Sequence, residues 1–246
     1  MSNVSSKDIL KKEITFFKEL HLYFNYADVK KLLIEKNLQI TNSTLKTYLH
    51  FLTKEKVLFD AGKGWYSSIE KPFRLNKEPV KEIISTINQK LPLLPFFCWS
   101  TEQLNPFTHH ILSKFITFVY TDSDYLRNTV EILDEMNYSV FENPTKAEIL
   151  KLFKIDEKTV IVLPAISKQP ESNENYAPIE KILIDFLMEN IKYKIMESSE
   201  AEKVVEKALV SGRLNISVML SYAERRKFNL PKSINQVHLN TKGGDS

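Results

Sequence analysis

The chain has 246 residues, of which 43% are hydrophobic and 26% charged, with a formal net charge of +3. This composition is that of an ordinary globular protein, and the length is sufficient for two domains. No apolar run approaches the ~20 residues needed to span a bilayer, and the N-terminus lacks the apolar stretch of a signal peptide. We therefore expect a cytoplasmic protein with no membrane contact.

The N-terminal segment is predicted to form three short helices. Residues 7–20 place apolar side chains at helical spacing, and the link HLYF follows them. Asn25 is suited to cap a second helix. After the short, strand-like connection LQI, one of residues 41–43 can cap a third helix, TNSTLKTYLHFLTKEK. Leucines at i, i+4 and i+7 give this third helix a buried side.

A hairpin is predicted directly after the third helix. Residues 57–67 contain two short β-prone runs around AGKG. Gly62 and Gly64 can take the positive φ that a tight hairpin needs. Three helices and a hairpin in this order are typical of a winged helix-turn-helix domain, which we assign to residues 1–72.

The rest of the chain alternates between helical and extended patterns. We place a linker at 73–79, a mixed α/β domain at 80–232 and a flexible tail at 233–246, so the expected fold class is α+β. Helices are expected at 80–91, 123–137, 145–153, 178–191, 200–212 and 215–228, and strands at 95–100, 115–121, 138–142 and 159–165.

The third helix carries a polar side that fits the major groove of DNA. Five hydrogen-bonding or basic residues fall at offsets 0, +3, +4, +7 and +11, and none is acidic: Ser43, Lys46, Thr47, His50 and Lys54. Residues 1–78 hold 14 Lys+Arg against 9 Asp+Glu, a net charge of +5, which leaves −2 for the rest. Positive charge is therefore concentrated in the N-terminal third of the chain, where the phosphates of bound DNA would lie.

Further contacts are expected at both ends of this surface. The start of the third helix could bind phosphate through side chains and backbone N–H groups, which belong to Asn42, Ser43 and Thr44. Lys63 at the hairpin tip could touch a neighbouring phosphate, whereas we interpret Trp65 and Tyr66 as a tether to the core. Two alternatives stay open: this side of the helix is simply solvated, or the three helices and hairpin form a protein-interaction module.

The second domain shows no pattern that indicates catalysis or a cofactor. His109 and His110 are adjacent, so on a helix they diverge and cannot grip one metal ion. Asp122 and Asp124 follow the end of a predicted strand, where catalytic carboxylates often lie. They also precede a predicted helix, and capping that helix is the commoner role. Cys98 lies in the apolar run PFFCW, and we interpret it as a small buried hydrophobe. Since a Gly-rich phosphate loop is also missing, we do not expect an enzyme.

Three segments together resemble a known family. They are the helix and hairpin start TNSTLKTYLHFLTKEKVL, the stretch CWSTEQLNPFTHHI leading into FITFVYT, and APIEKILIDFLMEN with its Pro-x-Glu-Lys-x-Leu/Ile pattern and Asp185. In this order they resemble the AbiEi-type antitoxins of type IV toxin–antitoxin (abortive infection) systems, which are winged helix-turn-helix transcriptional regulators.

The resemblance implies a protein with two roles. Its winged helix would bind inverted repeats in its own promoter, and its C-terminal domain would counter a co-encoded nucleotidyltransferase-like toxin without needing a stable complex with it. Three basic residues of the second domain could add phosphate contacts, although they also suit a helix C-terminus: Arg225, Arg226 and Lys227. The alternatives are a ligand-responsive repressor with a sensing α/β domain and a degenerate nuclease-like protein.

Overall fold

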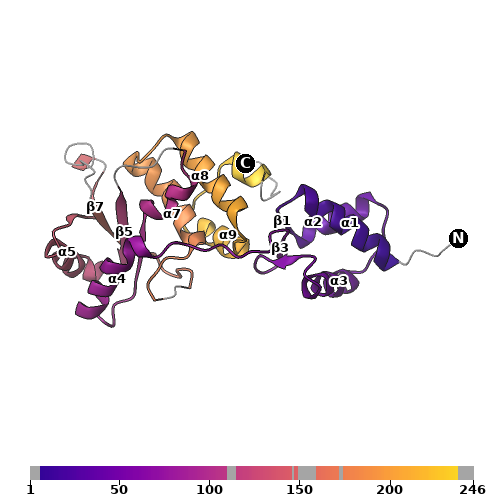
Figure 1. Cartoon of the computed structure of the whole chain (residues 1–246), viewed down its shortest axis with the longest axis horizontal. Coiled ribbons are helices and arrows are strands. Elements are labelled where there is room, and N and C mark those ends of the chain that lie inside the picture. Colours follow the sequence, from indigo (N-terminus) through magenta and orange to yellow (C-terminus); the bar gives the residue numbers. More distant parts are fainter. Residues whose placement is uncertain (1–5, 110–114, 146, 149–158, 172–173, 238–246) are drawn as a thin grey trace. The chain divides into compact units, whose positions relative to one another are not determined.

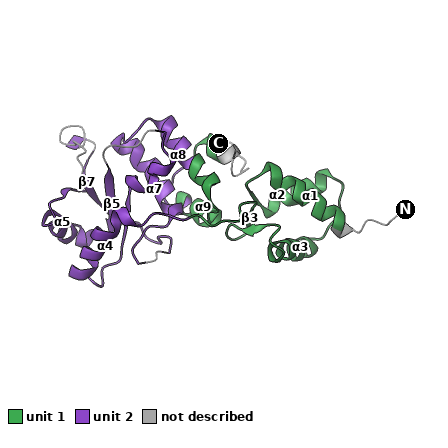
Figure 2. Cartoon of the chain, viewed as in Figure 1, with its two compact units in different colours: residues 1–73, 206–223, 229–246 green, residues 74–205, 224–228 purple. Residues whose placement is uncertain are grey.

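The computed structural model describes residues 6–109, 115–145, 147–148, 159–171 and 174–237. They divide into two units, shown in Figure 2 in green and purple. Unit 1 comprises residues 1–73, 206–223 and 229–246, and unit 2 comprises residues 74–205 and 224–228. Together they form a mixed α/β fold with two sheets. In this described part of the chain, no helix is long and apolar enough to cross a membrane.

Unit 1 begins with three helices, α1 (Ser6–Leu20), α2 (Tyr26–Glu35) and α3 (Asn42–Lys54). The start of α2 is fixed by a capping box, in which the Asn25 side chain accepts the Asp28 N–H and the Asp28 carboxylate accepts the Asn25 N–H. Thr41 caps α3 by accepting the Thr44 N–H. Both helix starts agree with the sequence predictions. The three helices enclose a core built from Leu10, Ile14, Phe24, Val29, Leu33, Leu45, Tyr48, Leu49, Leu52 and Leu58.

A small antiparallel sheet closes unit 1. Its strands are β1 (Tyr23–Asn25), β2 (Phe59–Asp60) and β3 (Trp65–Ser67), in the order β1-β3-β2. The predicted hairpin is present, with Gly62 at φ +103° and Gly64 at φ +76°. The segment expected to be a plain link instead forms β1, because its backbone pairs with β3.

Residues from the end of the chain complete unit 1. Helix α8 spans Ser198–Ser211, α9 spans Ile216–Arg225 and α10 spans Lys232–Val237. The parts of these helices within 206–223 and 229–246 belong to unit 1. The buried Tyr23 hydroxyl lies 3.0 Å from the carbonyls of Leu209 and Gly212 and accepts the Leu214 N–H at 3.1 Å. Helix α10 begins where the sequence indicates a loose tail, and its Ile234 is fully buried.

Unit 2 is built on a four-stranded sheet in the order β4-β5-β7-β6. Strand β4 runs antiparallel to β5, whereas β5, β7 and β6 are mutually parallel. The strands are β4 (Phe96–Ser100), β5 (Ile116–Thr121), β6 (Ser139–Glu142) and β7 (Thr159–Pro164). The helical elements are α4 (Glu78–Lys90), η1 (Thr101–Phe107), η2 (Ser123–Tyr125), α5 (Leu126–Asp134) and α7 (Ile179–Tyr193).

Helices cover both faces of this sheet (Figure 1). On one face, α4 and α5 pack their isoleucines and valines against Phe96, Cys98, Val119, Val160 and Val162. On the other face α7 packs, with the Tyr193 ring 5.8 Å from Phe118. Burial on both faces explains why β7 is a continuous apolar run rather than an alternating one. Of the helix expected at 145–153, Thr145 and Glu148 make the reciprocal capping-box bonds, and residues 149–153 lie outside the described residues.

Candidate nucleic-acid interface

Helix α3 separates a buried side from a solvent-facing side. Leu45, Tyr48, Leu49 and Leu52 are buried. Every α3 residue expected to contact DNA is exposed, and these are Asn42, Ser43, Thr44, Lys46, Thr47, His50 and Lys54. The exposed side therefore carries hydroxyl, amide, imidazole and ammonium groups in one continuous strip.

Tyr26 connects three elements at one edge of this strip. Its backbone N–H, at the start of α2, donates to the Gly64 carbonyl of the hairpin at 3.0 Å. Its hydroxyl lies 3.1 Å from the Asn42 Oδ1 atom at the start of α3. The Lys46 ammonium lies 6.0 Å from the centre of the Tyr26 ring. The start of α2, the start of α3 and the hairpin thus converge around one side chain.

The tip of the hairpin is braced by the residues that begin α9. The Lys63 N–H donates to the Ser217 Oγ atom at 3.0 Å, and the Ile216 N–H donates to the Ala61 carbonyl at 2.8 Å. A Cβ atom on Gly62 would lie 2.1 Å from the Asn215 Oδ1 atom, so only glycine fits there. The Lys63 side chain itself is exposed. Backbone hydrogen bonds therefore hold the hairpin tip in place, while the Lys63 ammonium group faces solvent.

The two aromatic residues after the tip behave as the expected tether. Trp65 is buried, and the Tyr66 ring stacks on Phe24 with a centroid distance of 6.1 Å. Burial also raises the pKa of the Tyr66 hydroxyl. Both side chains fix the hairpin to the core of unit 1.

A groove of about 560 Å³ borders the other edge of α3. Its apolar lining includes Leu10 of α1, Ile40 and the α3 aromatics Tyr48 and Phe51. Hydroxyl-bearing residues surround these side chains, namely Thr41, Ser43, Thr44 and Thr47. Phe51 is 47% exposed. Three of the residues expected to contact DNA therefore also line an apolar groove.

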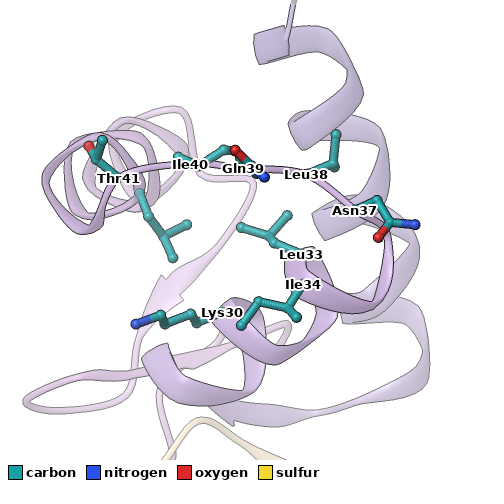
Figure 3. A pocket seen from close by; sticks show the side chains of 9 residues that line it. Lys30, Leu33, Ile34, Asn37, Leu38, Gln39, Ile40 and Thr41 are labelled. Atoms are coloured by element: carbon teal, nitrogen blue, oxygen red, sulfur yellow. The ribbon is translucent and has the colours of Figure 1, made fainter.

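A second hollow, of about 670 Å³, lies on the α2 side of the connection between α2 and α3. Figure 3 shows Lys30, Leu33 and Ile34 of α2 on one side of it and the connecting residues 38–41 on the other. Both hollows share Gln39, Ile40 and Thr41. The segment that connects α2 to α3 therefore lies between the two hollows.

Unit 2 contains a cluster of buried charges that the sequence pattern did not reveal. Lys181, Asp185 and Glu189 follow one another at intervals of four residues on α7. The Lys181 ammonium, fully buried, donates to the Asp185 Oδ2 atom at 2.7 Å. The Arg226 guanidinium donates to the Asp185 Oδ1 atom at 2.9 Å and to the Glu189 Oε1 atom at 3.3 Å. The Tyr120 hydroxyl donates to the same Glu189 oxygen at 3.0 Å.

Burial dominates the electrostatics of this cluster. Desolvation lowers the pKa of Lys181 from its ordinary value, and the neighbouring Asp185 carboxylate opposes the change. Desolvation likewise raises the pKa of Glu189, against the pull of the Arg226 guanidinium. Two basic and two acidic side chains thus face one another, and the Lys181 ammonium also lies 4.1 Å from the centre of the Tyr120 ring.

This cluster changes the interpretation of the three basic residues near the end of α9. Arg226 was expected to be available for phosphate, but its side chain is only 12% exposed and is paired with two carboxylates. Arg225 and Lys227 are exposed.

The other candidates from the second domain have ordinary surroundings. Asp122 caps η2 by accepting the Asp124 N–H, in agreement with the capping interpretation. Cys98 is fully buried, and burial raises the pKa of its thiol well above the ordinary range. His109 is exposed, and His110 lies outside the described residues. Among the residues that the structure describes, no group of three or more His, Cys, Asp or Glu side chains could hold a metal ion.

Residues 44–241 match a family of unknown function, DUF6577. Because the match covers most of the 246 residues, the chain belongs to that family. The matched region begins within α3 and extends through the hairpin and unit 2. No curated protein matches the chain.

Proposed function

We propose that unit 1 is a winged helix-turn-helix module that binds double-stranded DNA, with α3 in the major groove. The observation that carries this proposal is the solvent-facing side of α3, which is polar and basic apart from the exposed Phe51 and has no acidic residue between Asn42 and Lys54. The convergence of α2, α3 and the hairpin at Tyr26 supports it further, because a winged helix needs these three elements on one surface.

The proposed interface divides into positioning and reading groups. Lys46, Lys54 and Lys63 are long, exposed cations that pair with phosphates and set the register of α3 on the duplex. Thr47 and His50, on the middle of the helix, contact base edges. The side chains of Asn42, Ser43 and Thr44 at the start of α3 meet the backbone of one strand.

A mobility shift with paired variants tests this assignment. We expect the full chain to bind a preferred duplex, and Lys46→Ala with His50→Ala to abolish that preference. The matched control is Lys81→Ala with His109→Ala, which removes an exposed lysine and an exposed histidine from unit 2 and should leave binding unchanged. Unchanged affinity in the α3 variant would refute the recognition-helix assignment.

We further propose that this DNA binding represses the chain's own promoter, and that the protein is the antitoxin of a type IV toxin–antitoxin system. The resemblance to AbiEi-type antitoxins supports this proposal. Binding would then favour an inverted repeat in the upstream DNA, and co-expression would relieve the toxicity of a neighbouring nucleotidyltransferase-like protein. Arg225 and Lys227 are exposed and remain candidates for additional phosphate contacts, whereas the Arg226 guanidinium is already paired with two carboxylates. Continued toxicity on co-expression would refute the antitoxin role.

A further inference from the structure

Phe51 is placed where a DNA-binding surface would read an apolar group. It lies on α3 four residues after Thr47, so the two side chains are neighbours along one side of the helix. Its ring is held against Tyr48, with a centroid distance of 6.2 Å. It nevertheless remains 47% exposed. The ring therefore presents a fixed apolar surface on the side of α3 that faces solvent.

An exposed cation follows Phe51 along α3. Lys54, three residues after Phe51, is exposed on the same side of the helix. The Glu55 carboxylate, at the C-cap of α3, is paired with Lys11 at 3.1 Å, and the Asp8 carboxylate of α1 also acts on Tyr48. A ligand in this groove would contact apolar side chains and the surrounding hydroxyl groups, and the Lys54 ammonium lies further along the same side of α3.

Thymine in a duplex has these complementary features. In the major groove it presents a 5-methyl group next to the O4 acceptor, with a phosphate alongside. The methyl group fits against the Phe51 ring, and the Thr47 hydroxyl can donate to O4. A purely apolar protein segment would instead leave the threonine hydroxyls without new partners.

We propose that Phe51 determines specificity by packing against the 5-methyl group of thymine. The proposal rests on the proposed DNA binding of α3 and adds the base that one edge of the helix recognises. In this proposal Phe51 contacts the base directly and is not simply a core side chain that is left partly exposed.

The test uses the full chain and a duplex chosen by the protein itself. A pool of short duplexes with a random centre is selected on the wild type, and the preferred duplex is then resynthesised with uracil in place of thymine. Uracil keeps every hydrogen-bonding group and lacks only the methyl. We expect about a fourfold loss of affinity for each contacted thymine, the equivalent of one buried methyl group.

Two variants make the result specific. Phe51→Ala should bind the thymine and uracil duplexes equally, because the surface that contacts the methyl is gone. Phe16→Ala removes another exposed phenylalanine, 57% exposed on α1, and should discriminate like the wild type. Melting curves establish that both variants are folded, which their exposed positions favour.

The outcomes separate the two proposals. If the wild type selects no duplex, the proposed DNA binding fails, and the thymine contact fails with it. If the wild type selects a duplex but uracil costs the same in wild type and Phe51→Ala, DNA binding stands and the thymine contact is overturned. A Phe51→Ala variant that keeps its discrimination but changes its sedimentation would make this groove a protein contact instead.

Discussion

Neutralising Asp185 should destabilise unit 2 more than any surface substitution. The carboxylate is fully buried, and its two oxygens each accept one charged donor, Lys181 at 2.7 Å and Arg226 at 2.9 Å. Asp185→Asn leaves two buried cations opposite one remaining carboxylate, Glu189. Removing one partner of a buried ionic set costs about 3–5 kcal/mol. At roughly 2–4 °C per kcal/mol for a chain of this size, the melting temperature should fall by about 6–20 °C.

Urea unfolding of the full chain measures this cost. Trp99 lies in unit 2, stacked on Phe118, and in a Trp65→Phe background its fluorescence reports on unit 2 alone. The matched control is Glu131→Gln, which breaks an exposed pair with Arg127 of the same i,i+4 type on α5 and should cost no more than about 0.5 kcal/mol.

A double variant separates charge imbalance from lost packing. Lys181→Met with Asp185→Leu removes one cation and one carboxylate together, which leaves the Arg226–Glu189 pair balanced. It should therefore recover about half or more of the stability lost in Asp185→Asn. A loss below about 1 kcal/mol for Asp185→Asn, or a double variant less stable than the single one, would refute the reasoning.

Three further predictions concern other parts of the molecule. Because burial raises the pKa of Glu189 above its ordinary 4.5, the folded state holds this proton more tightly than the unfolded state. Stability from this group is therefore lost as pH rises above 4.5, and the advantage of wild type over Glu189→Gln in paired melts should shrink with rising pH. An advantage that grows with rising pH would contradict this. Gly212→Ala would place a Cβ atom 2.7 Å from the Phe73 Cα atom, so calorimetry should show a loss of about 1–3 kcal/mol, and an unchanged melt would disprove the close approach. Ser217→Ala removes the acceptor of the Lys63 N–H, and the loosened hairpin should weaken DNA binding roughly fivefold in a mobility shift; equal affinity would show that the brace is not needed.

Local patterns were sufficient to predict α1, α2, α3 and the β2–β3 hairpin of unit 1, and most elements of unit 2. Asn25 and Thr41 cap helices in the structure because their side chains act on N–H groups only two or three residues away. The glycines of the hairpin are equally local, since their positive φ is a property of the turn itself. The polar side of α3 could also be predicted, because helical spacing alone sets which residues share a side.

What the sequence did not reveal depends on residues far apart in the chain. Strand β1 has only three residues and exists through its pairing with β3. The contacts of Tyr23 with residues 209–214 join positions almost the length of the chain apart. Lys181 lies on a helix whose apolar stripe dominates its pattern, and its burial becomes possible only because Asp185 is four residues away and faces Arg226. Helical spacing alone places Lys181 beside Asp185, but no local rule predicts the pairing of Asp185 with Arg226, 41 residues further along the chain.

A salt-titrated mobility shift of the full chain tests the central claim most directly. The competitor is random DNA, and the probe is the chain's own upstream DNA. If α3 and the hairpin bind phosphates through Lys46, Lys54 and Lys63, the plot of log affinity against log salt should have a slope of about −3 per bound copy, at −0.9 per phosphate. The account predicts this slope together with a preference for one sequence. Equal binding to random DNA, or affinity that does not change with salt, would contradict it.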